Sequence, residues 1–303
     1  MEAIRRCCAL VTRPPGISWA GILVLVILLP SVGRAVRCAG ADSPDFRSSS
    51  SRAAQDDALR SIPFEKLSPE SRKKIDRVTS NVSLFRRMPV RVIPCHHDMY
   101  LFLVEHPDVM VNIWETLQLS QMRMRQAGPR LYDVDDGGGS TGRMEYLYSS
   151  PDTHIVYVEG SCSSPLFAKP AQGRTLLVLK SGYISQPHGD RYVTCRLDAF
   201  IQIDHGGVEL LTKAVQPVVG RIADLNFVQT AAFAGSLSRT AEVNPPGMQR
   251  LAERLTSIDP AVRQQFMEIA GRIASEPQPV LAGSIAEDSP PLVAQQPGAL
   301  QTR

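Results

Sequence analysis

The segment "RYVTCRLDAFIQID", residues 191–204, decides the fold that this sequence predicts. Apolar and polar residues alternate along it, and only Phe200 departs from the pattern. Such alternation indicates a strand of an antiparallel sheet with one buried face. From residue 206 to residue 236 the spacing changes, because apolar side chains recur every three or four positions, as on one face of a helix. A strand that leads into one long helix is therefore the central prediction.

The residues before this strand predict two short helices and further antiparallel strands. Residues 98–119 have apolar side chains at helical spacing, but Pro107 stands in the middle. Proline removes a backbone hydrogen bond and clashes in a helix interior, so we expect two short helices or one sharply bent helix. The predicted strands cover residues 88–94, 121–128, 130–136, 143–149, 154–161, 174–183 and 191–204, about seven in all.

The first 41 residues have the features of a signal peptide. Arginines precede an apolar segment at residues 17–33, and the small residues at 39–41 provide a cleavage site. We therefore expect an exported protein, located in the periplasm, in the cell envelope or outside the cell. Arg34 and Arg37 lie between the apolar segment and the cleavage site. They are unfavourable for cleavage, so an uncleaved N-terminal membrane anchor is the alternative.

The rest of the chain divides by composition. Residues 42–60 are polar and of low complexity, which is typical of a flexible tether. Ser68 followed by Pro69 is a good helix start, and so is Asp259 followed by Pro260. We predict a signal peptide (1–41), a flexible linker (42–66), an accessory helix and connector (67–87), an α+β domain (88–240), a C-terminal helical extension (241–274) and a disordered tail (275–303).

The order of these elements resembles that of the helix-grip superfamily. That group includes START lipid-transfer domains, the birch-pollen allergen type and polyketide cyclase/dehydrases. The resemblance covers about residues 88–236 and rests on element order. It implies a curved antiparallel sheet wrapped around the long C-terminal helix, with the two short helices closing one end. It also implies an apolar ligand between sheet and helix. A cystatin-like fold is the rival, but such folds usually place the principal helix first.

The charge balance argues against a nucleic-acid partner. Residues 1–41 contain five arginines and one glutamate, so the remaining chain has 28 basic and 29 acidic residues. Binding to phosphate backbones needs a concentrated positive field. The sequence shows no basic run of that kind. We expect no nucleic-acid partner, and membrane contact only through an uncleaved N-terminal anchor.

Methionines and tyrosines on the predicted inward faces are the candidate ligand contacts. Methionine adapts to irregular shapes, and a tyrosine hydroxyl can orient a ligand by a hydrogen bond. We predict that the partner is an apolar small molecule or lipid, and a filled core is the alternative interpretation. The predicted binding residues are Met122, Met124, Met144, Tyr146, Tyr148, Val156, Cys195, Leu197 and Ile222.

Two short motifs have the residue types of binding sites but not the spacing. Cys95, His96, His97 and Asp98 are consecutive, so their side chains cannot converge on one metal ion in a strand or helix. We predict no metal site, and we expect Asp98 to cap a helix that begins at Met99. The glycine-rich segment "DDGGGSTG" (135–142) lacks the lysine of a phosphate-binding loop, so we expect a hairpin connection.

The sequence shows no set of catalytic residues and implies no cofactor. A cyclase or hydrolase that uses His154, Asp198 or a tyrosine as acid or base is one alternative function. An envelope-associated interaction protein that works through its C-terminal helices is another. After signal-peptide cleavage Cys95, Cys162 and Cys195 remain, so at most one intramolecular disulfide can form. We expect Cys195 to be a buried structural residue, and its pairing with Cys162 stays open.

Overall fold

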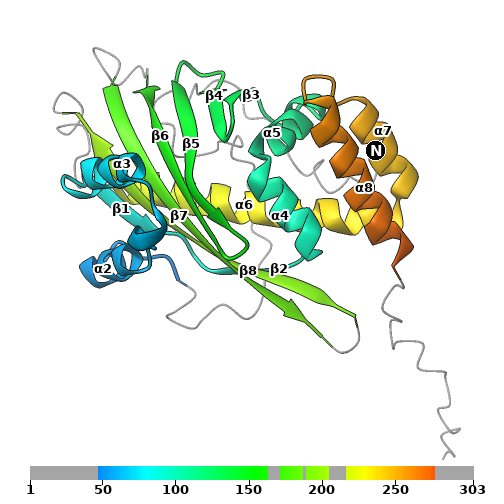
Figure 1. Cartoon of the computed structure of the whole chain (residues 1–303), viewed down its shortest axis with the longest axis horizontal. Coiled ribbons are helices and arrows are strands. Elements are labelled where there is room, and N and C mark those ends of the chain that lie inside the picture. The colour runs from blue at the N-terminus through cyan, green and yellow to red at the C-terminus, as the bar shows by residue number, and fades with distance from the viewer. Residues whose placement is uncertain (1–46, 163–170, 187–188, 205–215, 277–303) are drawn as a thin grey trace, which may run out of the picture.

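A computed structural model describes residues 47–162, 171–186, 189–204 and 216–276 (Figure 1). The chain has the α+β fold that the sequence predicts: a curved antiparallel sheet wraps around a long C-terminal helix. This is the helix-grip arrangement. The sheet has eight strands in the described residues, one more than predicted.

The strands from the third to the eighth form an antiparallel meander, and the two N-terminal strands pair with the free edge of the last strand. Their order is β1-β8-β7-β6-β5-β4-β3, and β2 pairs with β8 beside β1. The strands are β1 (Leu84–Arg87), β2 (Arg91–Pro94), β3 (Arg123–Gly128), β4 (Leu131–Asp135), β5 (Thr141–Ser150), β6 (Thr153–Cys162), β7 (Ala171–Ser185) and β8 (Arg191–Ile203).

Three helices lie on the concave side of the sheet. Helix α6 (Gln216–Val243) extends beyond the predicted end at residue 236, and residues 206–215 lie outside the described part. Helices α4 (His97–Glu105) and α5 (Pro107–Thr116) meet at Pro107, as predicted, and α5 begins at that proline. They close one end of the concave side (Figure 1).

The C-terminal helices belong to the same core as the sheet. Helix α7 (Pro245–Glu253) and helix α8 (Pro260–Ser275) bury Leu251 and Phe266 against residues of α4, α5 and α6. The phenyl rings of Phe266 and Phe102 stack at 5.8 Å. The predicted cap is confirmed, because the Asp259 side chain accepts a hydrogen bond from the Ala261 amide.

The convex side of the sheet is covered as well, which corrects two predictions. The predicted flexible linker contains helix α2 (Arg52–Arg60) and a short 3-10 turn (Phe64–Lys66), followed by α3 (Pro69–Thr79). The predicted connector contains strand β1. A second apolar core lies between these helices and the sheet, and Phe200, which breaks the alternation of its strand, is fully buried in it. The helices occupy this side because the sheet presents apolar side chains on both faces.

No described helix has both the length and the apolar character needed to cross a membrane. The predicted signal peptide or anchor lies outside the described residues.

The absence of a side chain at Gly235 allows α6 to pack closely against β2, so adding a side chain there should destabilise the fold. An ideal Cβ at Gly235 would stand 2.9 Å from the Pro94 carbonyl oxygen. Gly235→Ala is therefore expected to lower the free energy of unfolding by about 1–3 kcal/mol, although alanine is the better helix former.

The matched control is Gly271 in α8, where an added Cβ would meet nothing within 4 Å. Gly271→Ala is expected to raise the free energy of unfolding by about 0.5–1 kcal/mol. Urea denaturation of both variants measures the difference. Equal effects of the two substitutions would contradict the close packing of α6 on β2.

Candidate ligand-binding site

Apolar side chains on the concave side of the central strands keep part of their surface accessible. On the opposite face of the same strands, Leu176 and Phe200 have exposed fractions of 0%. At these central positions the concave face, where α6 lies, is therefore partly accessible, whereas Leu176 and Phe200 in the convex core are not. We call the accessible set the interior surface. It comprises Tyr146 of β5, Leu177 and Leu179 of β7, Leu197 of β8, and Ile222 and Phe227 of α6.

The predicted ligand contacts fall into three groups. Tyr146, Leu197 and Ile222 belong to the interior surface. Five others are buried in the adjoining core, where they pack against α4 to α8. These five are Met122, Met124, Met144, Val156 and Cys195. Their role in binding stays a prediction.

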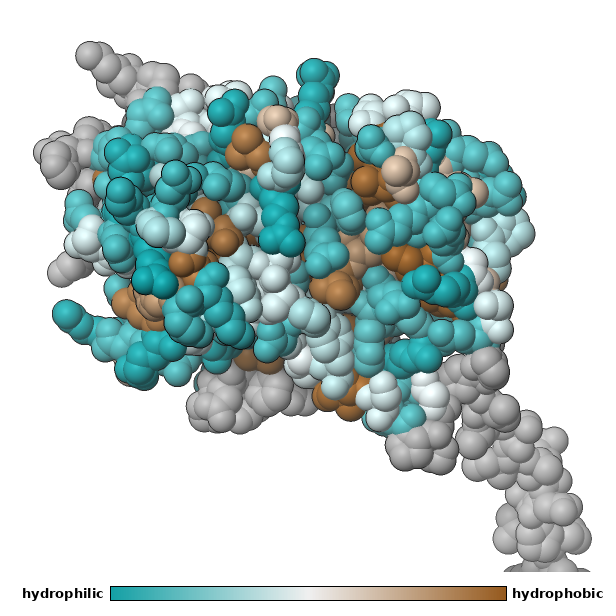
Figure 2. Space-filling view, viewed as in Figure 1, coloured by the Kyte–Doolittle hydropathy of each residue, from teal (hydrophilic) through white to brown (hydrophobic). Residues whose placement is uncertain are grey.

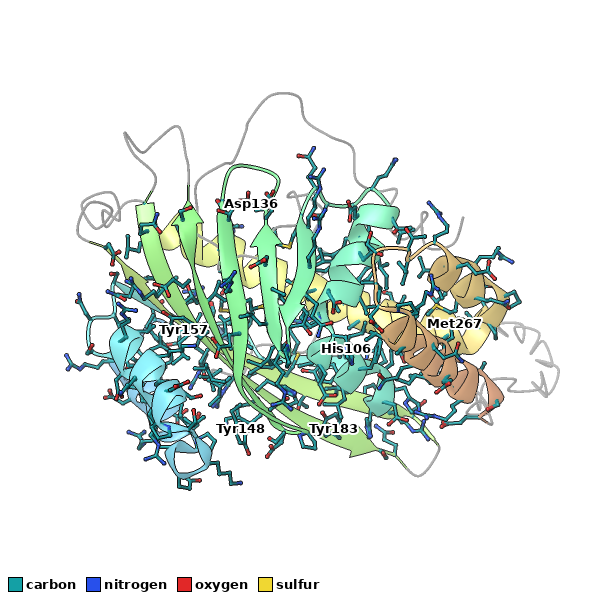
Figure 3. All side chains as sticks on the ribbon, turned by 45° about the horizontal axis from the view of Figure 1, so that its top comes forward. His106, Asp136, Tyr148, Tyr157, Tyr183 and Met267 are labelled. Atoms are coloured by element: carbon teal, nitrogen blue, oxygen red, sulfur yellow. The ribbon has the colours of Figure 1, made fainter. Side chains whose placement is uncertain are left out.

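Tyr148 lies on the other side of the sheet, contrary to the expected inward face. A β-bulge shifts the pairing of β5 with β6 between Tyr146 and Tyr148. A one-residue shift moves every following side chain to the opposite face. Tyr148 therefore packs against the convex core together with Tyr157, and Figure 3 shows Tyr157 beside the N-terminal helices.

Two tyrosine hydroxyls fasten the sheet to the end of α4. The hydroxyl of Tyr132 donates to the carbonyl oxygen of Glu105 at 3.3 Å, and that of Tyr146 donates to the carbonyl oxygen of Val104. Helix ends leave carbonyl groups without partners, and Pro107 has no N–H to extend the helix. The Tyr146 hydroxyl, expected to orient a ligand, is thus directed at the backbone.

Several buried polar atoms on the concave side have no hydrogen-bond partner within the described residues. Leaving such a group unpaired costs about 1–3 kcal/mol. His154 faces the concave side because it pairs with Leu179 in the sheet register. The unpaired atoms include Nδ1 and Nε2 of His154, Oγ1 of Thr175, Nδ2 of Asn226 and Nε1 of Trp114. This side therefore has unused hydrogen-bonding capacity among mainly apolar side chains.

The candidate acid–base residues do not converge. Asp198 pairs in register with Val178 and Arg87, and its carboxylate accepts hydrogen bonds from Arg87 on the convex side. His154 lies on the concave side, so the sheet separates the two groups. Catalysis by paired side chains needs them within hydrogen-bond reach of one substrate. The structure therefore does not bring His154 and Asp198 into one catalytic pair.

The row of potential metal ligands forms the start of α4. Cys95 is buried, His96 caps the helix by accepting the Asp98 amide at its Nδ1 atom, and the ring of His97 contacts Tyr183 at 4.9 Å. The expected cap by Asp98 was wrong, since its carboxylate instead bonds Arg272 at 2.8 Å. In the part of the chain that the structure describes, no three His, Cys, Asp or Glu residues lie close enough to hold a metal ion.

The glycine-rich segment joins β4 to β5, as expected of a hairpin connection. The Asp136 carboxylate accepts hydrogen bonds from the amides of Gly138 at 2.7 Å and Ser140 at 2.9 Å. Figure 3 shows Asp136 at the end of the sheet. These backbone donors are therefore occupied by a carboxylate of the loop itself.

Cys95 and Cys195 are free thiols in the core. Burial raises the pKa of each thiol to about 12. Cys162 lies on β6, and β7 separates that strand from β8, which contains Cys195. Cys195 therefore forms no disulfide in this structure, and it is a buried core residue as expected.

The chain was compared with known proteins. No family model matches it, and no curated protein does. Among solved structures, a conserved protein from Geobacillus kaustophilus is 11% identical, with a TM-score of 0.36, over 50% of this chain and 93% of that protein. Ara h 8.0201 is 10% identical, with a TM-score of 0.25, over 48% of this chain and 99% of its own.

The di-domain ARO/CYC StfQ from the steffimycin biosynthetic pathway is 15% identical to this chain. Its TM-score is 0.29, and the similarity covers 61% of each chain. With identities and TM-scores this low, the helix-grip assignment rests on the strand order of the chain itself and on the position of α6.

Proposed function

We propose that this protein is an exported, non-catalytic binding protein for an apolar small molecule or lipid, held between the sheet and α6. The observation that supports the proposal is the interior surface, where central side chains of a covered sheet face remain accessible. Leu177 and Leu176 are neighbours on β7, yet only Leu176 is fully buried. Ligand sites in proteins are concave and mostly apolar, with few polar groups.

The chemistry of the lining favours an apolar ligand. The interior surface consists of leucine, isoleucine, phenylalanine and tyrosine side chains. Removing apolar ligand area from water stabilises a complex by roughly 25 cal/mol per Å² before the costs of association. Figure 2 shows that the outer face in view is mainly hydrophilic, with small and separate hydrophobic patches. A partner that buries a large apolar area therefore fits the interior better than that face.

Phenylalanine substitutions on β7 test whether there is space beside the interior surface. Leu176→Phe is expected to lower the free energy of unfolding by about 1–3 kcal/mol, because Leu176 is fully buried in the convex core. Leu177→Phe is expected to cost less than about 1 kcal/mol, since its side chain borders accessible space. The pair is matched in strand, residue type and added volume, and urea denaturation measures both.

Ligand binding is tested on the same proteins. Native mass spectrometry of the purified mature chain is expected to show a co-purifying apolar molecule, and Leu177→Phe is expected to reduce its occupancy. The same spectrum gives the N-terminal residue and so tests cleavage before Asp42. A clean apo mass without uptake of fatty acids or polyaromatic dyes, together with equal costs of the two phenylalanines, would indicate a packed core and would refute the proposal.

A further inference from the structure

His154 is a buried neighbour of two residues of the interior surface, Tyr146 and Leu179. On β6 it pairs with Leu179 of β7, and its ring centroid lies 6.3 Å from that of Tyr146, with the rings nearly perpendicular. Both neighbours belong to the interior surface, whereas His154 itself has an exposed fraction of 0%. A molecule bound against Tyr146 and Leu179 would therefore lie close to the imidazole, and direct contact needs a movement of the side chains that cover it.

The imidazole has no hydrogen-bond partner at either nitrogen among the described residues. The hydroxyl of Tyr146, whose ring neighbours the imidazole, donates instead to the Val104 carbonyl oxygen. A leucine at this position would fill a similar volume without a desolvated polar group. The unpaired nitrogens thus reduce the stability of the protein alone, which is expected of a residue that serves binding.

The imidazole is neutral at physiological pH. Burial lowers the pKa of His154 to about 4, the positive charge of Arg130 acts in the same direction, and Asp152 opposes it. A neutral imidazole offers one N–H donor and one acceptor nitrogen. A hydroxyl group uses both and a carbonyl uses the donor, whereas an ionised carboxylate has a much larger desolvation cost in this buried and mainly apolar surrounding.

We propose that His154 is the polar anchor of the ligand site and binds a neutral hydroxyl or carbonyl group of an otherwise apolar ligand. This inference rests on the proposed function and specifies the ligand class. An anchor of this kind favours long-chain alcohols, ketones and sterol-like molecules. Alkanes lack the polar group that His154 would bind, and ionised fatty acids have a charged one.

The test compares a long-chain primary alcohol, the alkane and the carboxylate of equal carbon number. Each competes with a fluorescent apolar dye on the wild type, His154→Leu and His154→Gln. The wild type is expected to bind the alcohol more tightly than the other two. His154→Leu is expected to weaken alcohol binding about threefold to tenfold, the value of one hydrogen bond, and to leave alkane binding unchanged. His154→Gln, which keeps a neutral donor and acceptor, is expected to restore part of the loss.

The control is Tyr148→Phe, which removes a hydroxyl from the convex side and is expected to change none of the affinities. Equal losses of alcohol and alkane in His154→Leu, or no loss of either, would overturn the anchor role while the proposed function stands. Failure of all three ligands and of the dye to bind the wild type would overturn the proposed function, and the anchor role with it.

Discussion

Arg87→Met is expected to lower the free energy of unfolding by about 3–5 kcal/mol, because it leaves a buried carboxylate without its main partner. The Arg87 guanidinium donates two hydrogen bonds to the Asp198 carboxylate, from Nε at 2.6 Å and from Nη2 at 3.1 Å. The Asp198 side chain has an exposed fraction of 0%. In the variant, Arg196 remains as an ion-pair partner, with its Nε atom 3.3 Å from the Asp198 carboxylate.

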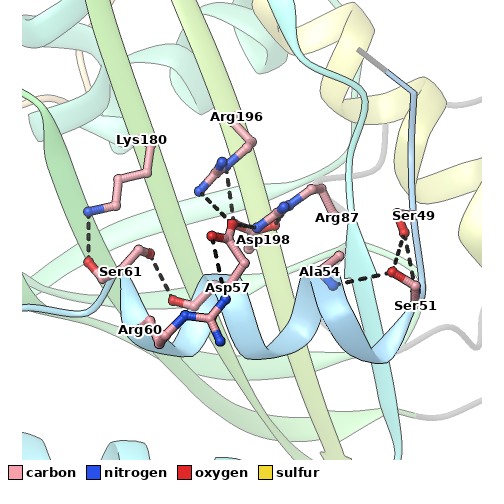
Figure 4. A network of polar contacts seen from close by, with 11 residues as sticks. Ser49, Ser51, Ala54, Asp57, Arg60, Ser61, Arg87, Lys180, Arg196 and Asp198 are labelled. Carbon is pink, nitrogen blue, oxygen red and sulfur yellow. Dashed lines mark hydrogen bonds and ion pairs between the residues drawn. The ribbon is translucent and has the colours of Figure 1, made fainter. Parts of the chain in front are cut away.

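The same arginine fastens α2 to the convex side of the sheet. Its Nη2 atom donates to the Asp57 carboxylate at 2.8 Å, and this hydrogen bond lowers the pKa of Asp57 (Figure 4). The nearby Lys180 ammonium donates to the carbonyl oxygen of Ser61 at the end of that helix. Loss of Arg87 should therefore release α2 as well as weaken the pairing of β1 with β8.

Urea denaturation measures the loss, and hydrogen exchange of the α2 amides reports the release. Arg60→Met is the control, because Arg60 also faces Asp57 but is 71% exposed and 4.0 Å away. That variant should change the free energy of unfolding by less than about 0.5 kcal/mol. Replacing Asp198 with Leu in the Arg87→Met background should recover part of the stability. Equal effects of the Arg60 and Arg87 substitutions would show that the buried ion cluster does not hold α2.

Acid is expected to destabilise the wild type by about 3 kcal/mol more than His154→Leu between pH 7 and pH 4. Burial lowers the pKa of His154 to about 4 in the folded state, below the usual value of about 6.5 in an unfolded chain. The unfolded state therefore binds more protons in this range. The stability is complete above pH 6.5 and declines as the pH falls to 4.

Urea denaturation at several pH values measures the difference between the two proteins. The comparison removes the contributions of other titrating groups, including Asp57 and Glu276, since both proteins contain them. The charged groups that act on His154, Arg130 and Asp152, are also present in both. Parallel stability curves for the wild type and His154→Leu would indicate that the imidazole is hydrated in the folded protein, and would contradict its complete burial.

Much of the architecture follows from local patterns in the sequence. The alternation in residues 191–204 is strand β8, and Pro107 ends one short helix and begins the next. Ser68 caps α3 and Asp259 caps α8, as their positions before a proline indicate. These predictions succeeded because each depends on backbone geometry within a few residues.

The N-terminal elements gave no comparable local pattern. Helix α2 buries only Ala54 and Ala58, so no stripe of large apolar residues distinguishes it from a polar tether. Strand β1 has four residues, too few to show an alternation. The clue lay elsewhere in the chain: Phe200 on the polar side of β8 needed an apolar cover, and Phe85 of β1 provides part of it at a ring distance of 5.0 Å.

The candidate site was predictable in outline but not in detail. Residue order indicated that Tyr146 and Leu197 would face α6, and both belong to the interior surface. The bulge that turns Tyr148 to the convex side depends on how β5 pairs with β6. The isolation of His154 depends on where the hydroxyl of Tyr146 is directed, toward the end of α4.

The sequence by itself determined the order and type of the main elements: strands with alternating side chains, two short helices separated at a proline, and one long helix after the last strand. Only the tertiary structure decided which faces are covered, which strand slips by one residue, and which polar groups are left without partners. The physical reason is that periodicity and capping arise from neighbours along the chain. Burial and hydrogen bonding depend instead on groups that folding brings together from distant positions.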